Sequence, residues 1–327
     1  MGQRARIVGT GSALPERIVS NEELAGLTGI SSAAIWRRTG IRERRWAAPD
    51  DATSDLAARA ATAALAQAGI APSALDAIIV STTSGDTLFP ATACHVQRLL
   101  DAKRAFAFDL SASCSGFLYA LSVGDQLIQA GSARRILVVA AEIKSRFLNF
   151  SEGETAILFG DGAGAAVLVP ESEGRGIVSV SLGTDGSQAN LIQIPAGGSR
   201  VPASEKTVGQ GQHAITMRGP RLFRAAVRRL ESAVNAALTE NELTVPGVSW
   251  FLFHQANGRL LEKVRERLGV TSERTESVIE RYGNTSSSSL PITLDTAIRA
   301  GKIKPHDLVL MATIGGGLTW GTALMRW

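Results

Sequence analysis

Short apolar runs alternate along the chain with longer stretches rich in small residues. Residues 77–80, 106–108 and 136–140 are apolar runs of strand length, whereas residues 54–68 have the length and composition of a helix. Alternation of short apolar runs with helical stretches is typical of an α/β fold. We therefore predict an α/β protein.

The same succession of elements occurs twice. Residues 106–110 are predicted to form a strand that leads through a turn into a helix ending near Gly131, followed by a strand at 136–139. Residues 277–280 are likewise predicted to form a strand before a turn, a helix ending near Gly301 and a strand at 308–311. This repetition predicts two copies of one αβ unit.

Counting along the two copies gives their alignment. Cys114 precedes Gly131 by 17 residues and Asn284 precedes Gly301 by 17, which makes Cys114 and Asn284 equivalent at an offset of 170. Residues 250–254 match residues 77–81 at an offset of 173. The apolar pattern breaks at residues 170–176, so we predict an N-terminal half, 1–172, and a C-terminal half, 173–327.

Three polar residues follow predicted strands. Cys114, His254 and Asn284 each come directly after an apolar run or its short turn. Ligands of open α/β sheets bind at the carboxyl ends of strands. If a pseudo-twofold axis relates the two halves, these side chains share one site.

The chain has two cysteines, Cys94 and Cys114, which are too few for a disulfide framework. A free cysteine is often a small buried packing residue. Cys114, however, lies between a predicted strand and a helix, where the helix N-terminus lowers a thiol pKa and the small neighbours Ser113, Ser115 and Gly116 admit a thioester. We interpret Cys114 as a nucleophile and assign Cys94 to the core.

His254 and Asn284 complete the candidate chemistry. His254 is the one histidine of four that ends an apolar strand, and the others are assigned structural roles. Asn284 would by default cap a helix. Because asparagine cannot take a proton, it can join a histidine in donating hydrogen bonds to an oxyanion, such as the enolate of a decarboxylated malonyl thioester. The enolate would then attack an acyl group on Cys114.

Backbone amides are candidates for a second oxyanion hole. Cys114 and the run Gly315-Gly316-Gly317 offer such amides, with Gly316 and Gly317 as the glycines we single out. Glycine permits close approach of the main chain to a ligand.

The charge balance narrows the choice of partners. The chain of 327 residues carries a formal charge of +4 with a pI near 9.4, which favours an anionic partner. Arg221, Arg224 and Arg228 would share one helix face, as a solvated surface or as a docking surface for an acidic carrier. Aromatic residues make up only 5% of the chain, and no zinc-finger spacing occurs, which disfavours nucleic acid.

No segment reads as a targeting or membrane element. The N-terminus lacks the apolar core of a signal peptide, and no run approaches the roughly 18 apolar residues of a membrane span. We therefore expect a cytoplasmic protein without membrane association, metal or permanently bound cofactor.

These residues lie in motifs that resemble ketoacyl-acyl-carrier-protein synthase III, of the thiolase superfamily, over nearly the whole chain. The matching segments are residues 7–15, 38–44, 113–116, 159–165, 254–257, 283–286 and 315–321. The resemblance implies a five-layered αβαβα sandwich, a homodimer and a ping-pong reaction through an acyl-cysteine. It further implies a coenzyme A or carrier-protein thioester as starter, malonyl-acyl carrier protein as extender and a 3-oxoacyl-carrier product.

The resemblance also implies binding roles. Phe89 would border the acyl pocket of the partner subunit, Arg224 and Arg259 would dock the carrier protein, and Arg38 and Asn257 would contact substrate. Two positions depart from the family, because Ala34 and Gly153 stand where a tryptophan and an arginine clamp the adenine of coenzyme A. Their loss removes about 1–2 kcal/mol of binding. Either the starter uses another carrier, or Trp36 replaces the lost ring.

Three alternatives stay open at this point. A related acyltransferase would deliver the acyl group to an alcohol or amine. A papain-like protease also has Cys, His and Asn in this order, but its local Cys-Gly-Ser-Cys-Trp signature is absent. A nucleic-acid-binding protein would rest on charge alone. The glycine-rich residues 159–165 are interpreted as a packing turn, because such a stretch alone is a weak nucleotide-binding signal.

Overall fold

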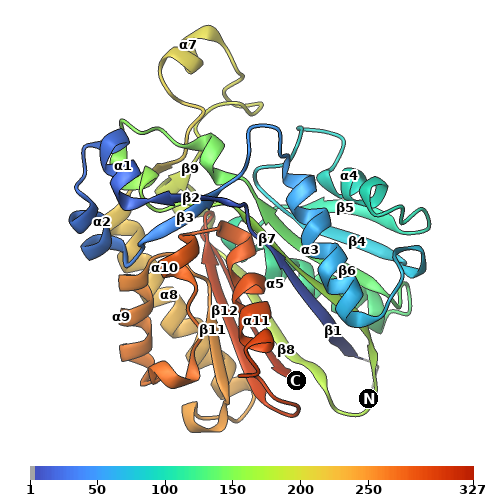
Figure 1. Cartoon of the computed structure of the whole chain (residues 1–327). Helices are drawn as coiled ribbons and strands as arrows, with labels where there is room; N and C mark the ends of the chain where they lie inside the picture. Colours follow the sequence, from blue (N-terminus) through green and yellow to red (C-terminus); the bar gives the residue numbers. More distant parts are fainter. Residues whose placement is uncertain (1–3) are drawn as a thin grey trace.

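The computed structural model describes residues 4–327 and contains two large sheets that lie face to face (Figure 1). The first sheet has the order β1-β7-β6-β4-β5, formed by β1 (Arg4–Ala13), β4 (Ala77–Ser81), β5 (Phe106–Leu110), β6 (Ile136–Glu142) and β7 (Gly162–Glu171). The second has the order β11-β12-β13-β8, formed by β8 (Gly176–Thr184), β11 (Trp250–Phe253), β12 (Leu308–Gly315) and β13 (Thr319–Arg326).

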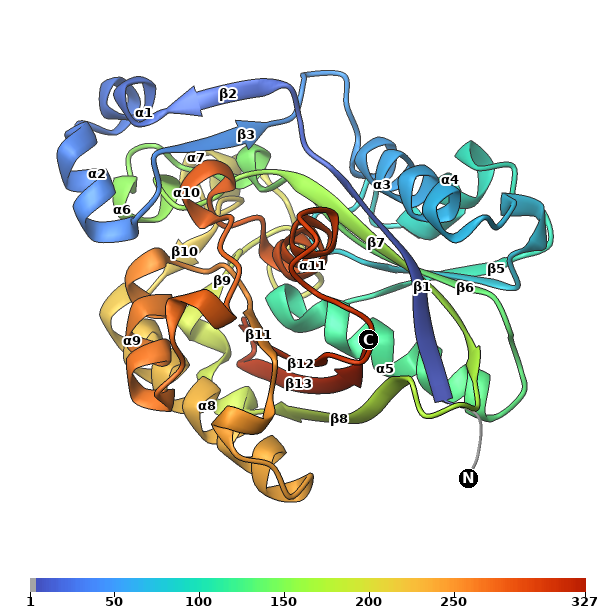
Figure 2. The same cartoon turned by 60° about the horizontal axis from the view of Figure 1, so that its bottom comes forward.

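Helices fill three further layers. Two helices, α5 (Gly116–Gln129) and α11 (Ser289–Arg299), lie between the sheets, as Figure 2 shows. The outer face of the first sheet is covered by α3 (Thr53–Ala68) and α4 (Thr92–Leu99), and that of the second by α8 (Gly219–Glu240) and α9 (Gly258–Leu268). The predicted five-layered αβαβα sandwich is thus confirmed.

Burial on both sides explains why the sequences of β4, β6 and α5 are mostly apolar. Every residue of β4 and β6 is buried, because helices cover both faces of their sheet. The helix α5 contacts both sheets and buries Phe117, Leu118 and Leu121. A helix packed on opposite sides is apolar around most of its circumference, which distinguishes it from a surface helix.

The two sheets repeat one topology. Strands β1, β7, β6 and β4 of the first sheet correspond in order and direction to β8, β13, β12 and β11 of the second. The chain passes from one sheet to the other between Glu171 and Gly176. Each half of the chain contributes one helix to the central layer, and the turns that precede α5 and α11 contact each other.

The strand predicted at residues 277–280 is wrong. The segment contains the short helix α10 (Ile279–Tyr282), and only a single bridge between Thr275 and Phe251 marks the position of a fifth strand. The side-chain carbonyl of Gln255 accepts hydrogen bonds from the amides of Val278 and Ile279. Because a buried side chain takes these donors, they are not available for a sheet ladder.

The predicted equivalence of Cys114 and Asn284 is also wrong. Short 3-10 turns, η2 (Ser113–Ser115) and η7 (Ser286–Ser288), lead directly into α5 and α11, at an offset of 173. The offset falls to 170 at the terminal glycines because α11 has 11 residues and α5 has 14. Cys114 therefore corresponds to Ser287, and Ser113 and Ser286 share a left-handed φ, of 52° and 55°.

Smaller elements form a cap over one edge of the sandwich. They are β2 (Arg17–Ser20), α1 (Asn21–Thr28), α2 (Ser32–Thr39), β3 (Glu43–Trp46), α6 (Gly153–Ala156), α7 (Glu205–Gly209), β9 (Ile192–Gln193) and β10 (Thr216–Met217). Most of them cluster in the upper left of Figure 1, and the loop that carries α7 projects furthest from the body of the protein. The cap lies at the end of the sandwich where β4, β6 and β11 finish.

Cys94 is not a core residue, contrary to the sequence-based assignment. The side chain is exposed on α4, while Ala93 and Val96 of the same helix are buried. Helical periodicity places residue 94 about 100° from residue 93, on the solvent side of this amphipathic helix. The short apolar run around Cys94 did not distinguish these faces.

Close packing of β1 on α3 depends on glycine. A Cβ at Gly11 would lie 2.4 Å from the carbonyl oxygen of Ala60 and 2.5 Å from the amide nitrogen of Ala64. Because both atoms belong to a helix backbone, Gly11→Ala must displace α3, and we expect a loss of about 2 kcal/mol in unfolding free energy. Urea denaturation measures it. Gly26→Ala, in α1 with no atom within 4 Å, is the control and should be neutral or stabilising.

Candidate active site

Cys114, His254 and Asn284 line one cavity of about 570 Å³. Cys114 comes from η2 before α5, His254 follows β11, and Asn284 precedes η7 and α11. One side chain from the first sheet's half of the chain thus faces two from the second. The cavity wall is otherwise mostly apolar and reaches the protein surface between α2, α6 and the first turns of α8 and α9.

Cys114 is a buried thiol rather than an exposed thiolate. Burial raises the pKa of Cys114, while the Ser286 hydroxyl and the Lys144 ammonium act in the opposite direction. The sequence-based expectation of a lowered thiol pKa is therefore wrong. The strand-to-turn-to-helix placement was predicted correctly, but the mostly apolar cavity wall and the facing η7 turn leave the thiol only 6% exposed, and this burial raises its pKa.

The hairpin between β12 and β13 closes against the nucleophile. A Cβ at Gly315 would lie 2.7 Å from the amide nitrogen of Cys114, so no other residue fits there without displacing η2. Gly316 lines the cavity, and its amide donates to no backbone acceptor within residues 4–327. Gly317 follows in the turn and does not line the cavity, so of the two glycines singled out only Gly316 is placed beside Cys114.

The hydrogen-bond partners of His254 fix its tautomer. The Ser289 hydroxyl accepts from the Gln255 amide at 3.1 Å and lies 2.6 Å from Nδ1 of His254. The Ser289 hydroxyl has no other acceptor for its proton among the described residues, so the proton points to Nδ1 and the ring proton is on Nε2. Nε2 is buried and has no protein partner among the described residues, and His254 lines the cavity, so this N–H is available to a substrate.

His254 is neutral at any ordinary working pH. Burial lowers the pKa of His254 to about 3. A histidine that stays neutral can donate a hydrogen bond from Nε2 without delivering a proton at the same time. It therefore suits stabilisation of an oxyanion better than acid catalysis.

The buried His254 makes a pH-dependent contribution to stability. Because its folded pKa lies below the unfolded value near 6.5, the unfolded chain binds a proton first as the pH falls. The stability is fully present above pH 6.5 and declines toward pH 3, by about 2 kcal/mol between pH 7 and pH 5. We expect His254→Gln to lose this part of the slope, as measured by urea unfolding at both pH values. Equal slopes would contradict a neutral buried imidazole.

Asn284 is held so that its amide nitrogen is free. Its backbone N–H donates to Leu158 at 2.8 Å, and its carbonyl accepts from Gly160 at 3.0 Å. The side-chain Oδ1 accepts from the Ser286 amide at 2.8 Å. With Oδ1 engaged, Nδ2 is the group that Asn284 can offer to a ligand. The glycine-rich stretch is therefore a packing segment, as predicted, since a Cβ at Gly160 would lie 2.3 Å from the Tyr282 carbonyl.

Some of the candidate binding residues line the cavity, and others lie elsewhere on the protein. Arg38 lines the cavity mouth and forms an ion pair with Glu154. Asn257 also lines the cavity, but its Oδ1 caps α9 through the amides of Arg259 and Leu260. Arg224 is exposed on α8. The structure thus places Arg38 and Asn257 at the cavity and Arg224 on the outer surface.

Trp36 and Arg259 do not line this cavity. The Trp36 ring lies under two guanidinium groups, 4.2 Å from that of Arg42 and 5.5 Å from that of Arg259. Arg259 also donates to the carbonyls of Trp36 and Arg37 and pairs with Glu262. Both residues border a separate surface hollow and fasten α2 to α9. In this arrangement the ring is not free to replace the missing adenine contact.

Gly153, one of the departures from the family pattern, lies close to two side chains. A Cβ at Gly153 would lie 2.9 Å from the Ile30 side chain and 3.1 Å from Thr28. A larger side chain at this position would therefore require the Ile30 side chain to move and Thr28 to shift slightly. The neighbouring Glu154 instead brings a negative charge to the mouth of the cavity, beside Arg38.

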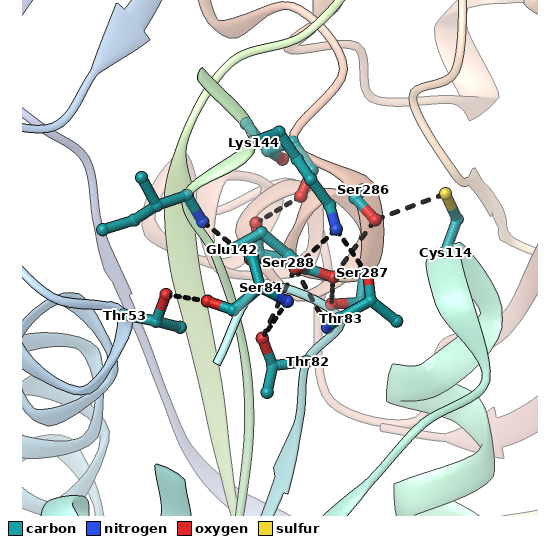
Figure 3. A network of polar contacts seen from close by, with 12 residues as sticks. Thr53, Thr82, Thr83, Ser84, Cys114, Glu142, Lys144, Ser286, Ser287 and Ser288 are labelled. Atoms are coloured by element: carbon teal, nitrogen blue, oxygen red, sulfur yellow. Dashed lines mark hydrogen bonds and ion pairs between the residues drawn. The ribbon is translucent and has the colours of Figure 1, made fainter. Parts of the chain in front are cut away.

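Sequence reasoning missed a polar cluster behind Cys114. Glu142 and Lys144 form a buried ion pair, with a carboxylate-to-ammonium distance of 3.0 Å, and the serines of η7 contact it (Figure 3). Lys144 also lines a second cavity of about 330 Å³ that shares Cys114 with the first. The run of four serines at residues 286–289 was a visible signal, since an apolar central helix rarely begins with so many hydroxyls.

Two absences concern the described part of the chain. Residues 4–327 hold no cluster of three or more His, Cys, Asp or Glu side chains arranged to bind a metal ion. None of the helices within the same range combines the length and apolar character needed to cross a membrane.

The fold and this site define the class of protein: a thiolase-fold condensing enzyme, with a thiol at the start of a central helix and two neutral hydrogen-bond donors. Family models for 3-oxoacyl-[acyl-carrier-protein] synthase III match residues 108–186, and models for its C-terminal region match residues 238–327. The chain belongs to the 3-oxoacyl-[acyl-carrier-protein] synthase III family.

Individual relatives agree with this assignment. A beta-ketoacyl-[acyl-carrier-protein] synthase III from Symbiobacterium thermophilum is 45% identical and covers 98% of this chain and 97% of its own. The crystal structure of the synthase III from Aquifex aeolicus matches with a TM-score of 0.91 and 38% identity, covering all of both chains. The priming beta-ketosynthase of the R1128 polyketide pathway matches with a TM-score of 0.92 and 34% identity, covering 99% of this chain and 96% of that one. The papain-like protease and nucleic-acid-binding alternatives are excluded as family assignments.

Proposed function

We propose that this chain joins an acyl starter, held on Cys114, to malonyl-acyl carrier protein with release of carbon dioxide, which gives a 3-oxoacyl-carrier protein. The observation that carries the proposal is one cavity lined by a thiol and two neutral donors, the N–H groups of His254 and Asn284. The relatives' name, beta-ketoacyl-[acyl-carrier-protein] synthase III, supports the same reaction.

In the first half-reaction the Cys114 sulfur attacks the carbonyl carbon of the starter thioester. A new carbon–sulfur bond forms, the bond to the carrier sulfur breaks, and the thiol proton leaves with the carrier as its free thiol. The amides of Cys114 and Gly316 would hold the oxyanion of the tetrahedral intermediate, which their position at the turn favours.

In the second half-reaction a malonyl thioester occupies the same cavity. The carbon–carbon bond to its carboxylate breaks, carbon dioxide leaves, and the electron pair moves to the thioester oxygen between His254 and Asn284. The enolate carbon then attacks the acyl carbon on Cys114, and the sulfur leaves as a thiolate, which takes up a proton from solvent to restore the thiol. Neutral donors suit this step because they stabilise the enolate without protonating it.

The surroundings support a carrier protein and a second subunit as partners. Arg221, Arg224 and Arg228 are exposed on α8, while Leu222 and Phe223 of the same helix line the cavity. Phosphate-bearing or acidic carriers would therefore find positive charge beside the entrance. Phe89 is 86% exposed, which is unusual for a ring of this size and supports its burial at a homodimer interface beside the partner's acyl pocket.

We propose a cytoplasmic location, because a catalytic thiol needs a reducing compartment. We also propose that no metal or permanently bound cofactor takes part, and that the two halves, 1–172 and 173–327, each contribute to the single site. Since Gly153, Ala34 and the Trp36 ring, which Arg42 and Arg259 cover, leave no adenine clamp at this cavity, a carrier-protein starter is as well supported as coenzyme A.

Mass spectrometry of the intact protein tests the proposal. The protein is incubated with a panel of acyl-coenzyme A and acyl-carrier donors, and then with malonyl-acyl carrier protein. We expect an acyl adduct mapped to Cys114, carbon dioxide release and a 3-oxoacyl-carrier product. An adduct that passes to an added alcohol or amine, with no carbon dioxide released, would favour the acyltransferase alternative instead.

A further inference from the structure

A hydroxyl group from the second half of the chain faces the nucleophile. Ser286 Oγ lies 3.4 Å from Cys114 Sγ and donates to Glu142 Oε1 at 3.1 Å. Figure 3 shows the hydroxyl between the thiol and the carboxylate. Because a carboxylate only accepts, the serine proton points to Glu142, and a serine lone pair is left to accept the Cys114 S–H.

Glu142 is a fixed anion at the end of β6. Its carboxylate accepts hydrogen bonds from Ser84 and Ser287, at 2.5 and 2.9 Å, and pairs with Lys144 at 3.0 Å. Burial alone would raise the pKa of Glu142, but Lys144 and these hydroxyls outweigh it and hold the pKa below its usual value. With so many donors, Glu142 does not depend on the Ser286 proton.

The Lys144 ammonium compensates the negative charge of Glu142. Without its ammonium, the buried carboxylate would repel a negative charge on Cys114 through a poorly screened interior. With the ammonium present, the ion pair carries no net charge, and the neighbouring Ser286 hydroxyl can rotate between Glu142 and the sulfur.

We propose that Ser286 is a further catalytic residue, whose hydroxyl accepts the Cys114 S–H in the resting enzyme and turns to donate to the sulfur when the thiolate forms. Glu142 and Lys144 are the positioning residues behind it. No covalent bond is made or broken in this step, and the thiol proton still leaves with the carrier sulfur. The inference rests on the proposed acyl-carrying role of Cys114.

The same residue orients a second catalytic group. The backbone N–H of Ser286 donates to Asn284 Oδ1 at 2.8 Å, in a turn where the φ of Ser286 is 55°. Since this bond uses the main chain, substitution of the Ser286 side chain leaves it in place. The hydroxyl can therefore be removed without releasing Asn284.

The pH dependence of Cys114 alkylation tests the hydroxyl directly and needs no acyl substrate. The rate of iodoacetamide labelling is followed on the Cys114 peptide, separately from Cys94, in wild type, Ser286→Ala and Ser287→Ala. Loss of a hydrogen bond to a thiolate should move the midpoint for Ser286→Ala upward by about one pH unit, with a tenfold slower labelling at neutral pH. Ser287→Ala is the matched control, since Ser287 is equally buried and contacts Glu142 but not the sulfur.

Equal shifts in both serine variants would overturn the proposal, because they would assign the effect to the network in general, and so would no shift in either. If Ser286→Ala does not fold, Ser286→Gly decides by the same criterion, because glycine suits the φ of 55° and also lacks the hydroxyl: an upward shift supports the arrangement, and an unchanged midpoint overturns it. Because alkylation reports on the thiol alone, a failed condensation assay with a normal alkylation result would count against the proposed reaction and not against Ser286.

Discussion

Cys114→Ala is expected to abolish the acyl-enzyme and reduce formation of the 3-oxoacyl product by at least about a thousandfold. No other thiol lines the cavity, and the one remaining cysteine, Cys94, is exposed on α4. The donors on His254 and Asn284 are untouched, so slow carbon dioxide release from malonyl-acyl carrier protein should persist. Adduct mass and carbon dioxide are measured side by side.

Cys94→Ala is the control for this experiment. It removes the other cysteine of the chain at a site away from the cavity, and both the adduct and product formation should match wild type. An adduct of normal stoichiometry on Cys114→Ala would mean that another residue carries the acyl group.

Strong local signals in the sequence predicted the α/β class and the gathering of Cys114, His254 and Asn284 at one site, whereas the five-layered sandwich was implied by the family resemblance. Buried strands such as β4 and β6 are continuous apolar runs, and the residues at strand ends are polar. The repeat in the chain then placed those ends together. Each of these inferences needs only the neighbours along the chain and the rule that strand ends hold ligands.

The errors came from effects that depend on distant residues. Residues 277–280 have strand-like composition, but Gln255 binds two of their amides. Cys114 has the turn of an activated thiol, but burial governs its pKa. Trp36 is close in sequence to the family's tryptophan position, but Arg42 and Arg259 cover its ring. Gln255 and Arg259 lie far along the chain from the segments that they contact, and the burial of Cys114 comes from the packing of both halves.

The alignment of the two halves shows how a small local change moves a functional position. Because α11 is three residues shorter than α5, counting back from the terminal glycine set Asn284 opposite Cys114. In the structure Ser287 holds that place, and Asn284 lies three residues earlier in the turn. The second half thus keeps the geometry of the turn but uses it to bring the Asn284 amide into the cavity and the Ser286 hydroxyl to the sulfur, while the Ser287 hydroxyl contacts Glu142.

His254→Ala and Asn284→Ala are expected to separate the two half-reactions. Each removes one donor to the enolate oxygen, and loss of such a donor costs about a hundredfold to a thousandfold in the step it serves. Acylation of Cys114 uses backbone amides instead, so its rate should fall by less than about tenfold. Single-turnover measurement of the acyl adduct, followed by carbon dioxide release after malonyl-acyl carrier protein is added, resolves the two steps.

Two further variants make this test more specific: the double variant of His254 and Asn284, and Ser289→Ala. Because both donors serve one oxyanion, the double variant should be little worse than the poorer single one. Ser289→Ala removes the hydroxyl that keeps the proton of His254 on Nε2, so it should slow decarboxylation while leaving acylation intact. His306→Ala, at an exposed position away from the cavity, is the control. Equal losses in acylation and decarboxylation would show that His254 and Asn284 hold the fold of the site rather than the enolate.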